Sequence, residues 1–337
     1  MSILKNFITL CCVAILVFSC AQQETTIYKN QNTGAALGTS YSLIYLSKEK
    51  LDFQREIDSV FGVVNQSLST YMPDSDISKI NRGDTTVVVD HMFQEVFKLS
   101  KEIHKSTAGY FDPTVGSLVN AWGFGPGEQI ELDSVSVDSL MQFVGFQKVE
   151  LTSENTIKKE HVNITFDFNA IAKGYAIDRL AKLMNQKGIN NYLLEVGGEL
   201  VSKGKNVITD KLWSIGIDDP QIEEGRQLKL VITLKDKALA SSGNYRKFRI
   251  DAITGEKFVH TINPKTGYTK NGKVLAANVL AADCATADAY ATAFMAMSLE
   301  NSIALLNEHQ ELEGYIIYLD SEGVTQEFMT PRFQSRE

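Results

Sequence analysis

The sequence is poor in cysteine, and the few cysteines that it has lie mostly at one end. Four of the 337 residues are Cys, and three of them, Cys11, Cys12 and Cys20, fall within the first twenty residues. Cys284 is then left without a partner for an internal disulfide, which excludes a small secreted scaffold held together by disulfides. A chain of this length can bury an adequate core without such bonds.

A surplus of basic residues is also lacking. The chain has 33 Lys and Arg against 41 Asp and Glu, a formal net charge of −8. Proteins that bind nucleic acids rely on clustered basic residues to displace the counterions of phosphates, and no such cluster occurs here. We therefore exclude nucleic acid as a partner.

No apolar run in the N-terminal region is long enough to span a bilayer comfortably. Lys5 precedes an apolar run over residues 7–18, broken by Thr9 alone, whereas a transmembrane helix needs roughly 20 apolar residues. The short run after a basic residue predicts a cleaved signal peptide over residues 1–19.

The end of this run resembles a lipobox, the motif in which a Cys takes a lipid and becomes the mature N-terminus. Residues 17–20 read Val-Phe-Ser-Cys, with a Phe bulkier than the usual residue at its position. We expect Cys20 to be lipidated and the polar residues 20–33 to form a tether. The protein would then be lipid-anchored to a membrane of the cell envelope and face the periplasm, with plain secretion as the alternative.

The remaining residues, 34–337, are expected to form one α+β domain. They contain no internal repeat, low-complexity block or Pro-rich linker, and the composition of the chain, 44% hydrophobic and 22% charged, is ordinary for a globular protein. Periodicity and capping residues predict helices over 51–68, 91–109 behind Asp90, 170–187 before Gly188, and 285–297 behind Asp283. Alternation of apolar and polar residues predicts strands over 162–168, 192–196, 213–217 and 257–259.

Residues 167–175 join the first of these strands to a helix and offer a possible phosphate site. A carboxylate, Asp167, ends the strand, and Lys173 lies in the first turn of the helix. The free N–H groups of a helix N-terminus attract anions, and a Lys there adds a full positive charge. An ordinary connection with a solvated Lys is the alternative.

The last long helix carries a possible metal site. Asp288 and Thr292 are four residues apart and therefore share one helix face. Carboxylate, hydroxyl and backbone carbonyl oxygens are the hard ligands that Mg²⁺ prefers. A solvent-facing Asp288 with Thr292 bonded to its own helix is the alternative.

Two further segments suit a ligand cleft. The aromatic and Gly-rich stretch 110–127 can approach a flat heterocycle closely, with Tyr71 as a further ring, although core packing explains such a stretch equally well. His260 stands at a strand end beside a turn, where a His can act in acid-base catalysis or be structural.

Taken together and in order, these segments resemble the ApbE family of flavin transferases over nearly the whole mature chain. The resemblance runs from residues 37–39 to residues 329–333. Its eight blocks are residues 69–71, 111–116, 122–126, 172–175, 196–199, 241–245, 260–267 and 287–292.

The resemblance implies an α+β fold with mixed sheets, packed helices and FAD in a deep cleft. It places FAD contacts at Leu37, Tyr71, Tyr110, Phe111, Asp112, Asp167, Lys173 and Ile262. It places Mg²⁺ on the Ala170 carbonyl, Asp288 and Thr292. The implied reaction attaches FMN through its phosphate to a Thr or Ser of an acceptor protein, a membrane redox subunit by expectation, and releases AMP, with His260 as base.

Two positions depart from the family pattern. Leu37 replaces the usual Met and keeps an apolar contact, whereas Ala291 stands where some members carry another carboxylate, so the metal shell is left open at that position. Hydrolysis of FAD to FMN and AMP, and a flavin-binding lipoprotein without enzymatic activity, are the competing functions.

Overall fold

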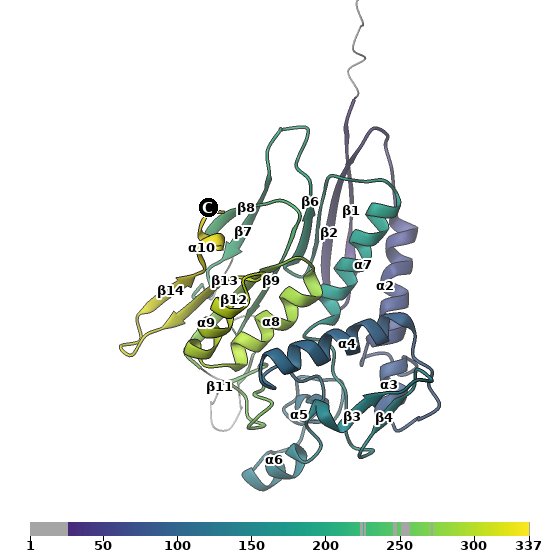
Figure 1. Ribbon diagram of the computed structural model, residues 1–337, viewed down its shortest axis with the longest axis vertical. Coiled ribbons are helices and arrows are strands. Elements are labelled where there is room, and N and C mark those ends of the chain that lie inside the picture. Colours follow the sequence, from purple (N-terminus) through teal and green to yellow (C-terminus); the bar gives the residue numbers. More distant parts are fainter. Residues whose placement is uncertain are drawn as a thin grey trace, which may run out of the picture.

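The centre of the fold is a single eight-stranded antiparallel sheet (Figure 1). The structure is a computed structural model that describes residues 26–222, 225, 227–244, 248–250, 257–270 and 272–336. In spatial order the strands are β1 (Tyr28–Ala36), β2 (Thr39–Ser47), β5 (Tyr192–Val196), β6 (Glu199–Lys203), β9 (Lys237–Gly243), β12 (Val274–Ala281), β13 (Glu313–Leu319) and β14 (Thr325–Met329).

Both faces of the sheet are covered, each by its own apolar core. The main core lies between the sheet and the helices α2 (Gln54–Leu68), α4 (His91–Ser106), α7 (Ala172–Gln186) and α8 (Cys284–Ala296). A second core lies against the paired strands β7 (Trp213–Asp218) and β8 (Leu228–Leu234) and the short helix α10 (Pro331–Gln334). The split follows from the strand period of two: Ala238 and Ala240 of β9 pack in the main core, and Leu239 between them packs in the second.

Smaller elements complete the fold around this frame. They are α3 (Asp76–Asn81), α5 (Gly116–Ala121), α6 (Ser134–Met141), the 3-10 helix η1 (Phe146–Lys148), β3 (Val149–Leu151), β4 (Ile157–Lys159), β10 (Phe248–Ile250), β11 (Lys257–Val259) and α9 (Leu299–Glu308). The α+β class predicted from the sequence is confirmed.

The predicted helix ends were mostly correct because capping residues mark them. Asp90 accepts a hydrogen bond from the N–H of Phe93 at 2.9 Å and begins α4. Asp283 caps α8 through the N–H of Thr286 at 2.8 Å. Gly188 adopts a φ of 75° just after α7, a conformation that is easy only for Gly.

The tether predicted over residues 20–33 is wrong from Tyr28 onward, because β1 begins there. Its polar residues resemble a linker in the sequence, but two of its Asn side chains are buried and hydrogen-bonded. Asn32 accepts a bond from the Tyr45 hydroxyl at 2.8 Å and donates to Asp52 at 2.7 Å. Residues 1–25, with the predicted signal peptide and Cys20, lie outside the described residues.

The strand predicted over residues 162–168 is also wrong, and burial follows its alternating sequence pattern only in part, because Val162 is exposed. Ile164, Phe166 and Phe168 are buried, yet the segment pairs through a single bridge from Thr165 to Val115. The side chain of Asn81 takes the place of a neighbouring strand, since it accepts from the N–H of Phe166 at 2.8 Å and donates to its carbonyl at 2.9 Å.

Among the described residues, no helix has both the length and the apolar character needed to cross a membrane.

Candidate active site

A cavity of about 360 Å³ brings together segments that are far apart in the sequence. Its walls come from the loop after α4, the turn before α7, the first residue of β6, the end of β9, the loop after β11 and one face of α8. All but two of the predicted binding and catalytic residues line it, namely Tyr110, Phe111, Asp112, Asp167, Ala170, Lys173, His260, Ile262, Asp288 and Thr292.

The two exceptions, Leu37 and Tyr71, lie beside the cavity instead of in its wall. Leu37 is the first residue of the two-residue turn between β1 and β2, with a φ of 52°, which is uncommon for a residue with a side chain. The N–H of Gly197, a lining residue, donates to the Ser40 carbonyl at 3.0 Å and holds this hairpin next to the cavity. The Tyr71 hydroxyl donates to the carbonyl of Phe124, another lining residue, at 3.4 Å.

The first turn of α7 presents a paired cation to the cavity. The ammonium of Lys173 forms an ion pair with Oε1 of Glu199, whose side chain is buried. Burial alone would lower the pKa of Lys173, but the negative charges of Asp288 and Glu199 raise it above its ordinary value. The two carboxylates therefore favour the charged form of Lys173, and its ammonium, although partly exposed, is paired with Glu199 and does not have water as its sole partner.

Glu199 is only half satisfied by this pair. Its Oε2 atom is buried and has no hydrogen-bond partner in the part of the chain that the structure describes. Burial raises the pKa of Glu199 to about 7, against the opposing effect of Lys173. A buried carboxylate oxygen without a partner is costly, so this arrangement is expected at a site that receives a ligand.

Asp288 faces the cavity from α8 and is 3% exposed, so a solvent-facing Asp288 is ruled out. Its Oδ2 atom accepts a hydrogen bond from the N–H of Gly174 at 3.2 Å, and burial raises its pKa. One turn further, Thr292 places its hydroxyl oxygen 3.3 Å from that of Ser242.

The oxygens available here fit a divalent cation. Asp288, Thr292 and Ala170 line the same cavity and supply carboxylate, hydroxyl and carbonyl oxygens, which are hard donors. No group of three or more His, Cys, Asp and Glu side chains suitable for a metal occurs within the described ranges, so the fit rests on this mixed set. Burial raises the pKa of the Asp288 carboxylate even though Lys173 is nearby. A bound cation would supply further positive charge beside this carboxylate.

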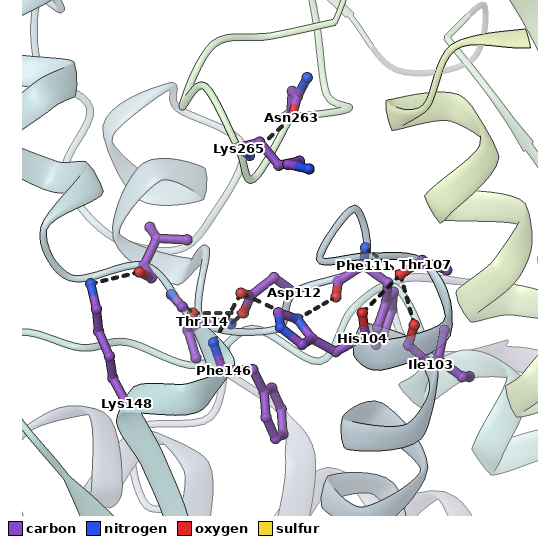
Figure 2. A network of polar contacts seen from close by, with 12 residues as sticks. Ile103, His104, Thr107, Phe111, Asp112, Thr114, Phe146, Lys148, Asn263 and Lys265 are labelled. Carbon is purple, nitrogen blue, oxygen red and sulfur yellow. Dashed lines mark hydrogen bonds and ion pairs between the residues drawn. The ribbon is translucent and has the colours of Figure 1, made fainter. Parts of the chain in front are cut away.

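Asp112 organises the loop that forms one wall of the cavity, as Figure 2 shows. Its Oδ1 accepts from the N–H and the hydroxyl of Thr114 at 2.8 and 2.6 Å, and its Oδ2 accepts from the N–H of Phe146 at 3.0 Å. The Nδ1 atom of His104 lies 3.4 Å from Oδ2 and 3.0 Å from the Phe111 carbonyl. The carboxylate thus fixes the backbone shape of the residues that the resemblance assigns to FAD.

Contacts beside the cavity join residues 110–122 to the loop after β11. The indole N–H of Trp122 donates to the Gly267 carbonyl at 2.8 Å, and the ammonium of Lys265 lies 4.7 Å from the centre of the Tyr110 ring. His260 lines the cavity between them, with its ring 6.5 Å from that of Phe124. These contacts hold together two segments that both contribute residues to the cavity wall.

Sequence reasoning gave no specific chemical role to several polar residues of this cavity, among them Glu199 and Ser242. Both stand inside segments that carried the family resemblance, at residues 196–199 and 241–245, but neither has a local pattern that reveals its partner. Tyr245, in the second segment, lies outside the described residues.

Known proteins resemble this chain over most of its length. The ApbE family model matches residues 37–316. The chain is 31% identical to the FAD:protein FMN transferase of Haemophilus influenzae over 92% of each chain, and 28% identical to that of Escherichia coli K12 over 93% of this chain and 89% of that protein. Among solved structures it is similar to the flavin transferase ApbE from Vibrio cholerae, with 29% identity, a TM-score of 0.82 and coverage of 93% of this chain and all of the other.

Proposed function

The chain belongs to the ApbE family, and from that membership we propose that it is an FAD:protein FMN transferase acting in the cavity described above. The enzyme takes FAD as substrate and attaches FMN through a phosphoester bond to a Thr or Ser hydroxyl of an acceptor protein. One observation carries the proposal: a single cavity joins a cation at a helix N-terminus, Lys173, to the oxygen donors Asp288 and Thr292.

The residues of the chain bind and orient the pyrophosphate. The N-terminal turn of α7 presents the ammonium of Lys173 and the positive end of the helix dipole, which suit the negative phosphates. When FAD enters, the phosphates compete with Glu199 for that ammonium. The loop held by Asp112 and the rings of Tyr110 and Phe111 suit a flat heterocycle on the apolar side of the cavity.

In the transfer step the acceptor oxygen forms a new bond to the FMN phosphorus as the bond between that phosphorus and the AMP oxygen breaks. The proton of the acceptor hydroxyl passes to a base, and AMP leaves. We assign the base to His260, which lines the cavity. Such transfer depends mainly on positioning and on stabilising charge.

A Mg²⁺ ion held by the Ala170 carbonyl, Asp288 and Thr292 would supply Lewis-acid stabilisation of the phosphate oxygens when bound. Ala291 contributes no ligand to this set, although some family members have a carboxylate there; water can take the place of that ligand. The buried, poorly compensated carboxylate of Asp288 supports this assignment.

The lipobox-like residues 17–20 support a lipid anchor at Cys20 and a location at the cell envelope, facing the periplasm. An anchored enzyme of this kind fits an acceptor that is itself a membrane-associated redox subunit. If Cys20→Ala and the unchanged protein partition alike into a detergent phase, the anchor is absent.

The function is tested by incubating the purified protein with FAD, Mg²⁺ and a redox subunit that exposes a Ser/Thr-Gly-Ala-Ser/Thr motif. We expect the subunit to gain the mass of FMN in intact-protein mass spectrometry and to fluoresce on a denaturing gel. FAD that disappears as free FMN and AMP, with no adduct, identifies a hydrolase instead. FAD that stays bound and intact identifies a flavin-binding protein.

A further inference from the structure

Helices α7 and α8 exchange hydrogen bonds between their side chains and each other's first turns. Asp178 of α7 accepts from the N–H of Cys284 through Oδ1 and from the N–H of Ala285 through Oδ2, both at 2.8 Å. In return, Asp288 of α8 accepts from the N–H of Gly174 in α7 at 3.2 Å. The first N–H groups of a helix have no acceptor within their own helix. Each of these carboxylates therefore accepts from N–H groups of the neighbouring helix that this neighbour cannot satisfy itself.

Helices α7 and α8 pack against each other (Figure 1), and their backbones approach closely at Gly174. A side-chain carbon added to Gly174 would lie 2.4 Å from the Cys284 carbonyl oxygen, closer than any real contact. No side chain therefore lies between the two backbones here that could change rotamer to accommodate a shift of α8 along α7. Any such shift moves Asp288 and Thr292 relative to Ala170 and Lys173.

We propose that Asp178 is a positioning residue for the cation site, because it fixes α8 on α7 at the spacing that aligns Asp288 and Thr292 with the Ala170 carbonyl. The inference rests on the proposed function. Asp178 is not among the residues that line the cavity, so it acts through the helix it holds and not through contact with substrate.

Capping of α8 alone does not account for Asp178. Asp283 already caps this helix from within its own segment, through the N–H of Thr286 at 2.8 Å. Asp178 adds a link that reaches 106 residues along the chain to the N–H of Cys284. Outer-shell partners that orient ligands in this way typically change metal affinity by about 10–100-fold when mutated.

The test compares Asp178→Asn with Asp283→Ala in the full-length protein. The amide introduced by Asp178→Asn keeps one acceptor but turns a donor toward the second N–H, so one of the two hydrogen bonds between the helices is lost. Asp283→Ala removes a bond at the same end of the same helix and leaves α7 untouched. Three measurements apply to both variants: Mn²⁺ binding by electron paramagnetic resonance with FAD present, the Mg²⁺ concentration for half-maximal adduct formation, and metal-free hydrogen exchange in the first turn of α8.

We expect Asp178→Asn to weaken Mn²⁺ binding and raise the half-maximal Mg²⁺ concentration by about tenfold, with much smaller changes in the rate at saturating Mg²⁺. Hydrogen exchange in the first turn of α8 should accelerate in both variants, while the metal affinity of Asp283→Ala stays at the wild-type value. If Asp178→Asn does not fold, Asp178→Ser, whose hydroxyl can accept from one N–H, takes its place with the same expected shift.

Wild-type Mn²⁺ affinity in a folded Asp178 variant overturns the inference, and so does an equal loss of affinity in Asp283→Ala. Both outcomes leave the proposed function standing, since the unchanged protein still makes the adduct. If the unchanged protein itself neither binds Mn²⁺ nor makes the adduct, the proposed function fails and the inference fails with it.

Discussion

Two buried glutamates begin strands of the same sheet, yet they differ in how completely they are paired. Glu313, the first residue of β13, is 1% exposed and receives two bonds from Arg336, at 2.5 and 2.7 Å, with Lys237 at 3.4 Å. Glu199, the first residue of β6, is 4% exposed and has one cation, Lys173, with a second oxygen that lacks any hydrogen-bond partner among the described residues.

The two environments shift the two acids in opposite directions. Burial would raise the pKa of Glu313, but Arg336 and Lys237 outweigh it and lower the pKa below its ordinary value. At Glu199 burial prevails and raises the pKa to about 7. The fully paired Glu313 stabilises the fold, because it holds the C-terminal segment against the sheet. The half-paired Glu199 lies in the cavity, where an acid with a shifted pKa indicates a ligand site. The comparison predicts that variants of the cavity lose activity and variants of the Glu313 cluster lose stability.

The largest effect on activity is expected from Asp288→Ala. Its carboxylate is the one charged donor assigned to the cation, so its loss should lower adduct formation by at least about 100-fold through several kcal/mol of lost charge stabilisation. The melting temperature should not fall by more than a few degrees, because a poorly compensated buried charge is removed. Thr292→Val is the milder companion, since water can replace a neutral ligand. Adduct formation at wild-type rate and Mg²⁺ dependence in Asp288→Ala would remove this residue from the site.

Glu313→Gln should do the reverse. Removing one partner of a buried ion pair leaves Arg336 and Lys237 without their carboxylate and typically costs about 3–5 kcal/mol of unfolding free energy. Urea unfolding measures the loss, and adduct formation per folded molecule should stay at the wild-type value because the cluster is not part of the cavity wall. A stable Glu313→Gln with low activity would contradict the division between the two clusters.

The sequence predicts features that depend on residues close together in the chain. It does not predict pairs that form only when a helix packs on the sheet. The spacing of Asp288 and Thr292 alone places them on one helix face. Asp90 and Asp283 likewise mark the starts of the helices that they cap. The pairing of Lys173 with Glu199 spans 26 residues and arises because α7 packs beside β6, which no local pattern encodes.

The two errors along the chain have the same origin. Residues 28–33 are polar and non-periodic, so the sequence pattern does not reveal that they pair with β2 or that Asn32 is hydrogen-bonded to Tyr45 and Asp52. Residues 162–168 alternate like a strand, but a side chain, that of Asn81, occupies the hydrogen-bonding groups of Phe166. In both cases an Asn side chain forms hydrogen bonds with residues that are distant in the sequence, and hydropathy patterns do not register such bonds.

A smaller effect distinguishes the two glutamates by pH. Because the pKa of Glu199 is raised in the folded protein, its contribution to stability is fully present below its unfolded value near 4.5 and is lost as the pH rises through about 7. Glu199→Gln cannot ionise, so without FAD it should become more stable relative to wild type between pH 5 and pH 8, by roughly 1–2 kcal/mol.

Thermal unfolding of both proteins across that range measures the difference. Glu313→Gln provides the opposite control: the pKa of Glu313 is lowered in the folded state, so the stability that this acid provides is lost as the pH falls. A Glu199→Gln curve parallel to wild type from pH 5 to pH 8 would show that Glu199 stays ionised throughout.

The smallest effect on stability and FAD affinity is expected for Tyr71, which lies beside the cavity. Its substitution tests whether an exposed residue contributes as much as the buried ones. Tyr71 is 54% exposed, and its hydroxyl reaches the Phe124 carbonyl at 3.4 Å, the long end of the range for a hydrogen bond. Tyr71→Phe keeps the ring and removes this bond, so unfolding free energy and FAD affinity should each change by no more than about 0.5 kcal/mol.

Tyr71→Ala removes the ring as well and should weaken FAD binding by about tenfold if the ring packs on the substrate. Flavin fluorescence titration of both variants separates the two contributions: equal losses in Phe and Ala would assign the contact to the hydroxyl, and no loss in either would leave Tyr71 outside the FAD site.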